Sequence, residues 1–481
     1  MDTQTPQVLS VPAAMPVESS HSLVEEISAY CRDVGMAEST FGRLSINDGK
    51  LMSRLRTGGR VTQVTLERVH AFMATNRAPL RRTAALRARE GGIRLRPIPA
   101  HGLSQDAERN FRFYDNRQKY LLFVTTCSEK WVVADRVNQE LANIHPRPPA
   151  VRVFDAGVGD GTVLTRLMRG MHHRYPTMPF HIVGKEISLE DVRLTLEKMP
   201  DRFYEHPATV LVMTNMHYNE APWLTPSSLT SASSLVWHEV ALTGSTAHDF
   251  EQQIRDLQPF LSEHWQAHVS PMSGNPVYDK PVVLVLYRDD YKFMLDSVRP
   301  RRGQPKADYD LVIASQPYRA RSSVEFKARR VIAPLARALG AGGRLIGIHG
   351  HGDDPGMEIV HKIWPDENPF TTDRHELLRA VRMELGKDAR NINFNAYADA
   401  RALFRFDMHT LPHEIGPNIG TSTLLAAWNA AIYVAQIEDW RLADVMANNA
   451  YLDATKEVLL KNGGLWFWDE SFVISRHQDH H

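Results

Sequence analysis

Residues 151–162 read Val-Arg-Val-Phe-Asp-Ala-Gly-Val-Gly-Asp-Gly-Thr, and this stretch decides the fold. Its apolar start is typical of a buried strand, its three glycines allow a tight turn, and residues 163–169 continue with a helical pattern. The first N–H groups of a helix have no partner within the helix, so they are available to a polar ligand. The stretch therefore predicts a strand, a ligand-binding turn and a helix.

Two acids narrow the kind of ligand. Asp155 stands directly before the glycines, where it would repel a pyrophosphate but can pair with the ammonium of an amino-acid moiety. Glu186 ends the next predicted strand and suits hydrogen bonds from ribose hydroxyls. Glycine triplets also occur in dinucleotide-binding turns and in turns without a ligand. The two acids are therefore the residues that distinguish a site for an amino-acid moiety and a ribose from these alternatives.

Together these residues resemble the class I S-adenosylmethionine-dependent methyltransferase family, over about residues 110–216 and 308–350. The resemblance implies a doubly wound, seven-stranded, Rossmann-like α/β sheet with S-adenosylmethionine as cofactor. In that family the loops after the first three strands hold the methionine half, the ribose and the adenine in turn. The residues so implied are Asp155, Gly157, Gly159 and Gly161 for the methionine half, Glu186 for the ribose, and Thr214 or Asn215 near adenine.

Beyond residue 150, short apolar runs alternate with amphipathic ones, which predicts strands alternating with helices in a parallel sheet. Residues 217–306 interrupt this rhythm and are interpreted as an insertion, although Val236–Leu242 and Val282–Tyr287 would also suit extra sheet strands. A long helix is expected from Asn110 to about Ala142. The seven expected strands are Val151–Phe154, His181–Lys185, Thr209–Met213, Tyr309–Ala314, Arg344–Ile348, Leu403–Met408 and Leu465–Ser475.

The loop after the predicted strand Tyr309–Ala314 is a candidate catalytic segment. Residues 315–318, Ser-Gln-Pro-Tyr, resemble the Asn/Asp/Ser-Pro-Pro-Tyr motif of methyltransferases that act on amino nitrogens, with glutamine in place of the first proline. The resemblance implies that Ser315, Gln316 and Tyr318 bind the target nitrogen; an ordinary loop is the alternative. His349 would serve as a general base near the transferred methyl. His349, His351 and the acids after them also have metal-ligand chemistry, but a substrate-lining loop is preferred and no metal is predicted.

The N-terminal region predicts four short helices, and residues 38–59 read as helix, tight turn and helix. This pattern resembles the phage-repressor type of helix-turn-helix domain. The resemblance implies that polar and basic residues of the second helix contact DNA, namely Lys50, Ser53, Arg54 and Arg56. A small helical bundle for dimerisation or partner binding is the alternative.

Length and composition set the domain organisation. We expect a disordered tail at 1–20, a helix-turn-helix domain at 21–76, a basic linker at 77–109 and a methyltransferase domain at 110–481. The chain has 56 Lys plus Arg against 56 Asp plus Glu, which excludes a global charge that would bind nucleic acid or lipid. Two cysteines exclude a disulfide framework, and no apolar run is long enough for a membrane helix, so a cytoplasmic protein is expected.

The combined prediction is a methyltransferase for an unidentified small-molecule or macromolecular N or O acceptor, tethered to a DNA-binding module. Two alternatives stay open. One is a DNA-binding regulator whose methyltransferase-like domain senses S-adenosylmethionine or another ligand, and the other is a nucleic-acid amino-methyltransferase. A homodimer is compatible with a helix-turn-helix domain.

Overall fold

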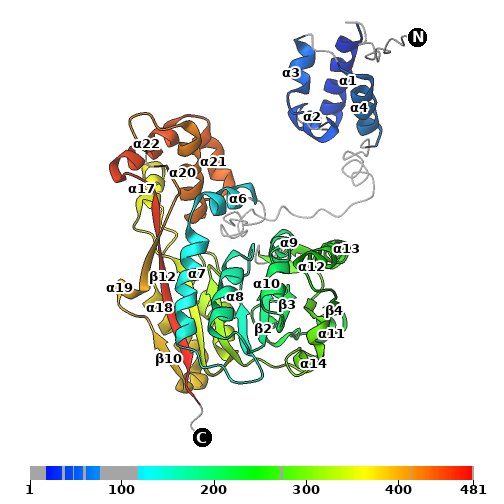
Figure 1. Cartoon of the computed structure of the whole chain (residues 1–481). Coiled ribbons are helices and arrows are strands. Elements are labelled where there is room, and N and C mark those ends of the chain that lie inside the picture. The colour runs from blue at the N-terminus through cyan, green and yellow to red at the C-terminus, as the bar shows by residue number, and fades with distance from the viewer. Residues whose placement is uncertain are drawn as a thin grey trace, which may run out of the picture. The chain divides into compact units, whose positions relative to one another are not determined.

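The computed structural model of the chain describes residues 18–34, 38–46, 48–57, 61–75, 117–270, 275–411 and 413–478 (Figure 1). The chain divides into two compact units, residues 1–101 and 102–481. The predicted basic linker lies outside the described residues, as does the predicted tail up to residue 17. Helix α1 (Glu18–Val34) begins inside the predicted tail, so the expectation of disorder is wrong for residues 18–20.

The described part of the first unit contains four helices, as the sequence predicted: α1, α2 (Glu38–Ile46), α3 (Leu51–Arg56) and α4 (Gln63–Thr75). Their apolar sides form one small core, in which Ile27, Phe41 and Leu51 are completely buried. Phe41 contacts Phe72 edge to face, with ring centroids 5.4 Å apart. The helical periodicity of the sequence is thus explained by burial of one stripe on each helix.

The second unit is built on a ten-stranded mixed sheet, in the order β10-β12-β9-β8-β1-β2-β3-β7-β4, with β11 paired to β12. From β1 the chain adds strands first on one side and then on the other, so the sheet is doubly wound. The central strands are parallel and β12 is antiparallel to β9. The ten strands are β1 (Val151–Asp155), β2 (Phe180–Lys185), β3 (Thr209–Thr214), β4 (Val236–Leu242), β7 (Val282–Arg288), β8 (Tyr309–Ser315), β9 (Leu339–Gly350), β10 (Ile392–Asn395), β11 (Leu403–Asp407) and β12 (Trp466–Arg476).

Two strands from the predicted insertion extend this sheet beyond β3. Strand β7 (Val282–Arg288) pairs antiparallel with β3, and β4 (Val236–Leu242) pairs parallel with β7. The interpretation of this whole stretch as an insertion is therefore wrong, and the alternative of extra sheet strands is correct. Every residue of β7 is buried, which is what a continuous apolar run predicts for a strand covered on both faces. A separate two-stranded sheet joins β5 (Ala267–Val269) and β6 (Pro276–Tyr278).

The far edge of the sheet also differs from expectation. Strand β11 (Leu403–Asp407) pairs with the first half of β12, and β10 (Ile392–Asn395), which was not predicted, pairs with the second half. The eleven residues of β12 provide an edge long enough for two successive short partners. Strand β10 escaped prediction because it is only four residues long and half of it is asparagine.

The long helix expected up to Ala142 is interrupted. Helix α6 (Arg117–Thr126) ends before Cys127 and α7 (Glu129–Asn138) begins after Ser128. The Ser128 hydroxyl donates to the carbonyl of Asp407 at 3.2 Å and accepts from its N–H at 2.9 Å. Pairing with the end of β11 thus competes with the helical bonds, a tertiary effect that helical periodicity does not reveal.

Helices cover both faces of the sheet (Figure 1). The first face packs against α7, α8 (Thr162–Arg174), α9 (Leu189–Glu197), α10 (Pro200–Glu205), α12 (Ala247–Arg255) and α13 (Gln258–His264). The second face packs against α14 (Lys292–Leu295), the π-helical turn Lys327–Ile332, α16 (Ala333–Arg337) and α18 (Arg374–Leu385). Shorter helices are α11 (Leu229–Ser233), α15 (Val324–Phe326) and α19 (Asp399–Ala402).

A third core lies beyond the end of β9. Helices α6, α17 (Pro355–Ile363), α20 (Thr421–Val434), α21 (Asp439–Met446) and α22 (Ala450–Asn462) gather there around Trp428 and Phe467 (Figure 1). Because α17 follows β9 almost directly, this helical group stands at the carboxyl edge of the parallel strands. None of the helices in the described ranges has the length and apolar character needed to span a membrane.

Candidate functional site

The turn between β1 and α8 leaves open space at one glycine and is tightly packed at another. Gly159 and Gly161 have φ of 56° and 78°, in the left-handed region that favours glycine. A Cβ at Gly161 would lie 2.9 Å from the Cα of Thr195, so α8 and α9 approach closely there. A Cβ at Gly157 would meet no described atom within 4 Å. The turn thus holds the backbone beside open space at Gly157.

Asp155 presents an unsatisfied carboxylate oxygen at this turn. The residue is 2% exposed, and its Oδ1 accepts a hydrogen bond from the N–H of Gly157 at 3.2 Å. Its Oδ2 is buried and has no hydrogen-bond partner within the described residues. Burial, together with the nearby charge of Glu186, raises the pKa of Asp155 to about 7. Since buried polar atoms are normally bonded, Oδ2 lacks the partner that a cationic group would supply.

Glu186 closes the turn from the neighbouring strand. Its Oε2 accepts from the N–H of Gly159 at 2.9 Å, and its Oε1 accepts from the N–H groups of Ile187 and Ser188 at 2.8 and 2.9 Å. A carboxylate has about four acceptor positions, so one remains after these three bonds. The carboxylate is therefore fixed in place with capacity for one more donor, such as a ribose hydroxyl.

Two residues before β1 that were not predicted, Tyr120 and Lys130, also reach this region. A Cβ at Gly159 would lie 3.3 Å from the Tyr120 hydroxyl of α6, which is buried without a hydrogen-bond partner among the described residues. Burial raises the pKa of Tyr120, and Asp160 adds to the effect. Nζ of Lys130 in α7 lies 3.2 Å from Oε2 of Glu129. Burial lowers the pKa of Lys130, but the negative charges of Glu129 and Asp160 raise it above the ordinary value. No local motif marks these side chains, because tertiary packing brings α6 and α7 over the turn.

The residues predicted near adenine are tied to the protein through their side chains. The Thr214 hydroxyl accepts from the N–H of Met216 at 3.3 Å. Asn215 donates to the carbonyl of Lys280 at 2.9 Å and accepts from the N–H of Val282 at 2.8 Å, which joins the end of β3 to the start of β7. The adenine contact stays a prediction, and the structure gives Asn215 a role in sheet assembly.

The predicted catalytic loop begins on the first face of the sheet. Ser315 ends β8 half-buried, and Gln316 has a left-handed φ of 47°. The backbone N–H of Gln316 donates to the carbonyl of Ile348 at 2.8 Å, and its side-chain amide donates to Oδ1 of Asp469 at 3.1 Å. Gln316 therefore reaches past β9 to a carboxylate on β12.

Asp469 is the second buried acid with an unsatisfied oxygen. It is 1% exposed, and its Oδ2 has no hydrogen-bond partner in the described part of the chain. Burial raises the pKa of Asp469 well above its usual range, and Glu129 adds to this shift while Lys130 opposes it. No motif in the sequence marks Asp469, and its position facing Gln316 follows from strand pairing.

Tyr318 and His349 are brought together, but on the other face of the sheet. The Tyr318 hydroxyl lies 3.0 Å from His349 Nδ1, and His349 Nε2 lies 2.7 Å from Oε1 of Glu470, which also binds Arg374. Burial alone would raise the pKa of Glu470, but its bonds to His349 and Arg374 hold it at about 2. The ionised carboxylate only accepts, so His349 donates through Nε2–H and Tyr318 donates to Nδ1.

This arrangement divides the predicted catalytic set. Ser315 and Gln316 belong to the face that carries Asp155, whereas Tyr318 and His349 are buried beneath α18 with Phe472. The division is a correction to the expectation of one catalytic cluster. Its causes are the left-handed turn at Gln316, directly after the end of β8, and the alternation of side chains along β9, which places His349 on the same face as Leu345. Within the described ranges, no group of three or more His, Cys, Asp and Glu side chains is arranged to hold a metal ion.

The residues predicted to bind DNA lie on the exposed side of α3. Lys50 precedes the helix, and Ser53, Arg54 and Arg56 are exposed, while its apolar residues are buried. Arg54 pairs with Asp48 at 2.8 Å and Arg56 pairs with Glu38 at 2.7 Å. The helix thus has a polar outer side whose arginines already have intramolecular partners, and its DNA contacts stay a prediction.

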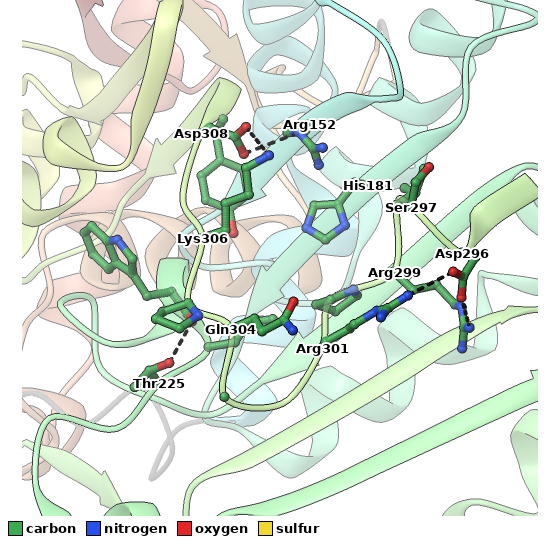
Figure 2. A pocket seen from close by; sticks show the side chains of 17 residues that line it. Arg152, His181, Thr225, Asp296, Ser297, Arg299, Arg301, Gln304, Lys306 and Asp308 are labelled. Carbon is green, nitrogen blue, oxygen red and sulfur yellow. Dashed lines mark hydrogen bonds and ion pairs between the residues drawn. The ribbon is translucent and has the colours of Figure 1, made fainter.

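A cavity of about 430 Å³ lies at the amino ends of β1, β2 and β8 (Figure 2). Figure 2 shows its cations held in ion pairs: Asp308 binds Arg152 and Lys306, and Asp296 binds Arg299 and Arg301. Doubly wound sheets bind ligands at the carboxyl ends of their strands. This cavity is at the opposite edge and is separate from the glycine turn.

The sequence matches no family model and no curated protein. Among solved structures, the chain is similar to an N-methyltransferase from Haemonchus contortus in complex with phosphomonomethylethanolamine and S-adenosylhomocysteine, with 12% identity over 77% of this chain and 61% of that one and a TM-score of 0.28. It is also similar to a geranyl diphosphate methyltransferase in complex with sinefungin, with 11% identity over 71% and 77% and a TM-score of 0.26. Similarities this distant do not assign a function to the chain.

Proposed function

We propose that the chain is an S-adenosylmethionine-dependent methyltransferase that acts on an unidentified nitrogen or oxygen acceptor. The observation that carries the proposal is the unsatisfied Oδ2 of Asp155, buried at the end of β1 beside the open space at Gly157. A buried carboxylate is costly unless a partner arrives, and the ammonium of the cofactor's methionine half has the charge and the donors that this oxygen lacks.

The remaining residues of the turn fit the same ligand. Glu186 has acceptor capacity left for a ribose hydroxyl, and the N–H groups at the start of α8 face the turn. A dinucleotide fits less well, because its pyrophosphate would meet the carboxylates of Asp155 and Glu186. When bound, the cofactor would supply a methyl group on a positively charged sulfonium, whose sulfide is the leaving group when a nucleophile attacks the methyl carbon. The chain's part is to hold both reactants in line and keep water out.

The proposal is tested by calorimetric titration of S-adenosylmethionine into the wild-type protein and into Asp155→Asn. A hydrogen bond to a charged group contributes about 1.5–3 kcal/mol, so we expect the variant to bind roughly 10- to 100-fold more weakly. Asp310→Asn is the matched control, since Asp310 is an acid of the same sheet at its other edge, where it accepts from the N–H of Arg152. Absence of saturable binding to the wild type would overturn the proposal.

We further propose that the first unit tethers the enzyme to DNA through the outer side of α3. The exposed Ser53, Arg54 and Arg56 support this, because phosphate contacts need polar and basic side chains on an accessible helix. The alternative regulator would bind both DNA and S-adenosylmethionine but transfer no methyl group. Measuring S-adenosylhomocysteine formation against an acceptor panel distinguishes the two.

A further inference from the structure

Two buried carboxylates with an unsatisfied oxygen occupy the carboxyl edge of the sheet. Asp155 ends β1 and Asp469 lies near the start of β12, opposite Gly350 at the end of β9. In the order β12-β9-β8-β1 they are three strand spacings apart, roughly 14 Å at about 4.8 Å per spacing. The register places Val473 level with Asp155, so Asp469 also lies four residues further along the strands, roughly 13 Å at about 3.3 Å per residue, and the two acids are about 19 Å apart. That span is wide enough for two small ligand groups side by side, one at each acid.

Both acids face the same side of the sheet. Asp155 lies two residues after Val153 and therefore on the same face of β1, and Val153 packs in the core formed with α7 and α8. Asp469 lies two residues before Ser471 and therefore on the same face of β12. The Ser471 hydroxyl accepts a hydrogen bond from Nε of Arg136 in α7 at 3.1 Å. Lys130 of α7 influences the pKa of both acids, so it lies within electrostatic range of each. The two carboxylates therefore belong to one region beneath α7.

Gln316 determines which oxygen of Asp469 remains unsatisfied. Its amide N–H occupies Oδ1, and its left-handed backbone orients the side chain toward β12. Oδ2 is left without a partner among the described residues. An ionised carboxylate oxygen accepts hydrogen bonds and attracts a positive charge, so the complementary ligand group is a donor that carries positive charge.

We propose that the methyl acceptor is an amine and that Oδ2 of Asp469 binds its nitrogen. This inference rests on the proposed methyltransferase function and names the substrate class of that site. A carboxylate acceptor would be repelled by Asp469 and Glu129, and a phenol would leave the buried negative charge uncompensated. An ammonium group satisfies the charge and the hydrogen-bonding capacity of Asp469 together.

Asp469 also accounts for the proton that an ammonium must lose before it reacts. The proton passes from nitrogen to Oδ2, and the freed lone pair forms a bond to the methyl carbon. The carbon–sulfur bond breaks with its electron pair remaining on sulfur, and the proton then leaves Asp469 for solvent. The upward shift of the Asp469 pKa supports this role, because a stronger base accepts the proton more readily.

The test uses two sets of probe acceptors, and each set contains an amine, a hydroxyl compound and a carboxylate of similar size. The aromatic set is benzylamine, p-cresol and phenylacetate. The aliphatic set is butylamine, butanol and butyrate. S-adenosylhomocysteine formation is measured with the full-length protein and saturating S-adenosylmethionine. We expect transfer to the amines in preference to the oxygen nucleophiles. We expect Asp469→Asn to lower this transfer at least 100-fold at neutral pH, while Asp310→Asn leaves it unchanged.

The pH profile separates proton removal from a structural effect. Asp469→Asn keeps an oxygen for the amide of Gln316, so the variant should fold and retain its affinity for S-adenosylmethionine. Without the base only neutral amine reacts, so its rate should rise about tenfold per pH unit below the amine pKa. The wild-type rate should rise less steeply over the same range.

Three results would overturn the inference: preferred transfer to p-cresol, butanol or a carboxylate; no transfer to either amine although S-adenosylmethionine binds; or an Asp469→Asn variant as active as the wild type. Failure of the proposed function itself gives a different result, because S-adenosylmethionine would then not bind to the wild-type protein at all.

Discussion

At the scale of single residues, two glycines of one turn make opposite predictions. Gly157→Ala places a Cβ in open space without backbone strain, so we expect the free energy of unfolding to change by less than about 0.5 kcal/mol. The same Cβ would occupy space beside Asp155, so affinity for S-adenosylmethionine should fall at least tenfold. Gly161→Ala forces a left-handed φ on alanine and brings its Cβ against Thr195, so we expect the free energy of unfolding to fall by about 1–2 kcal/mol or more.

Denaturant unfolding and calorimetry of the two variants check this pair. The expectation for Gly157 fails if Gly157→Ala binds S-adenosylmethionine as well as the wild type does. The expectation for Gly161 fails if its alanine variant is as stable as the wild-type protein.

The pKa of Asp155 sets a pH dependence for cofactor binding. It is raised from about 3.9 in the unfolded chain to about 7 in the fold, so the uncharged acid is favoured by folding. The contribution of Asp155 to the free energy of unfolding is fully present below about pH 4 and is lost as the pH rises through 7. An ammonium ligand needs the ionised form, so affinity should fall up to tenfold per pH unit below 7 and level off above it.

Calorimetry between pH 5.5 and 8 in buffers of different ionisation enthalpy measures both the affinity and the protons released. Near pH 6 we expect release of close to one proton on binding by the wild type and none attributable to this position in Asp155→Asn. Equal proton release by both proteins would show that another group is responsible.

At the scale of elements, Ser128 joins the break between α6 and α7 to the end of β11. Ser128→Ala removes both side-chain bonds to the backbone of Asp407, although the bond from the Ser128 N–H remains. We expect a loss of about 1 kcal/mol in the free energy of unfolding, measured with urea. Ser233→Ala is the control, because that hydroxyl is exposed and, among the residues that the structure describes, binds only the carbonyl of Thr230. Equal effects of the two substitutions would contradict a specific role for Ser128.

At the scale of the whole molecule, the two units are predicted to act independently. Arg54→Ala removes one candidate phosphate contact, so DNA affinity should fall and the slope of log K against log salt should decrease by about one. Affinity for S-adenosylmethionine should be unchanged, because Arg54 belongs to the first unit. Fluorescence anisotropy with a DNA duplex across salt concentrations tests this. Unchanged DNA binding in the variant would contradict a phosphate contact by Arg54, and absence of DNA binding by the wild type would favour a helical bundle with another partner.

Local patterns determined the central part of this protein. The apolar strands around β1, the glycine turn, Asp155 and Glu186 could be identified from sequence because strand, turn and terminal acid are contiguous or follow the same rule in successive strands. The four N-terminal helices were predictable because helical periodicity is a property of neighbouring residues.

Tertiary structure alone decided which distant groups meet. Part of the predicted insertion belongs to the sheet because the apolar strand β7 pairs with β3. The predicted long helix is divided in two because the Ser128 hydroxyl binds the backbone of Asp407 in β11. Side-chain alternation along β9 placed His349 on the face opposite Gln316, and the turn after β8 brought Tyr318 to His349. Strand pairing placed Asp469 beside Gln316. These outcomes depend on register and on the face of a strand, and both are fixed by contacts between residues far apart in the chain.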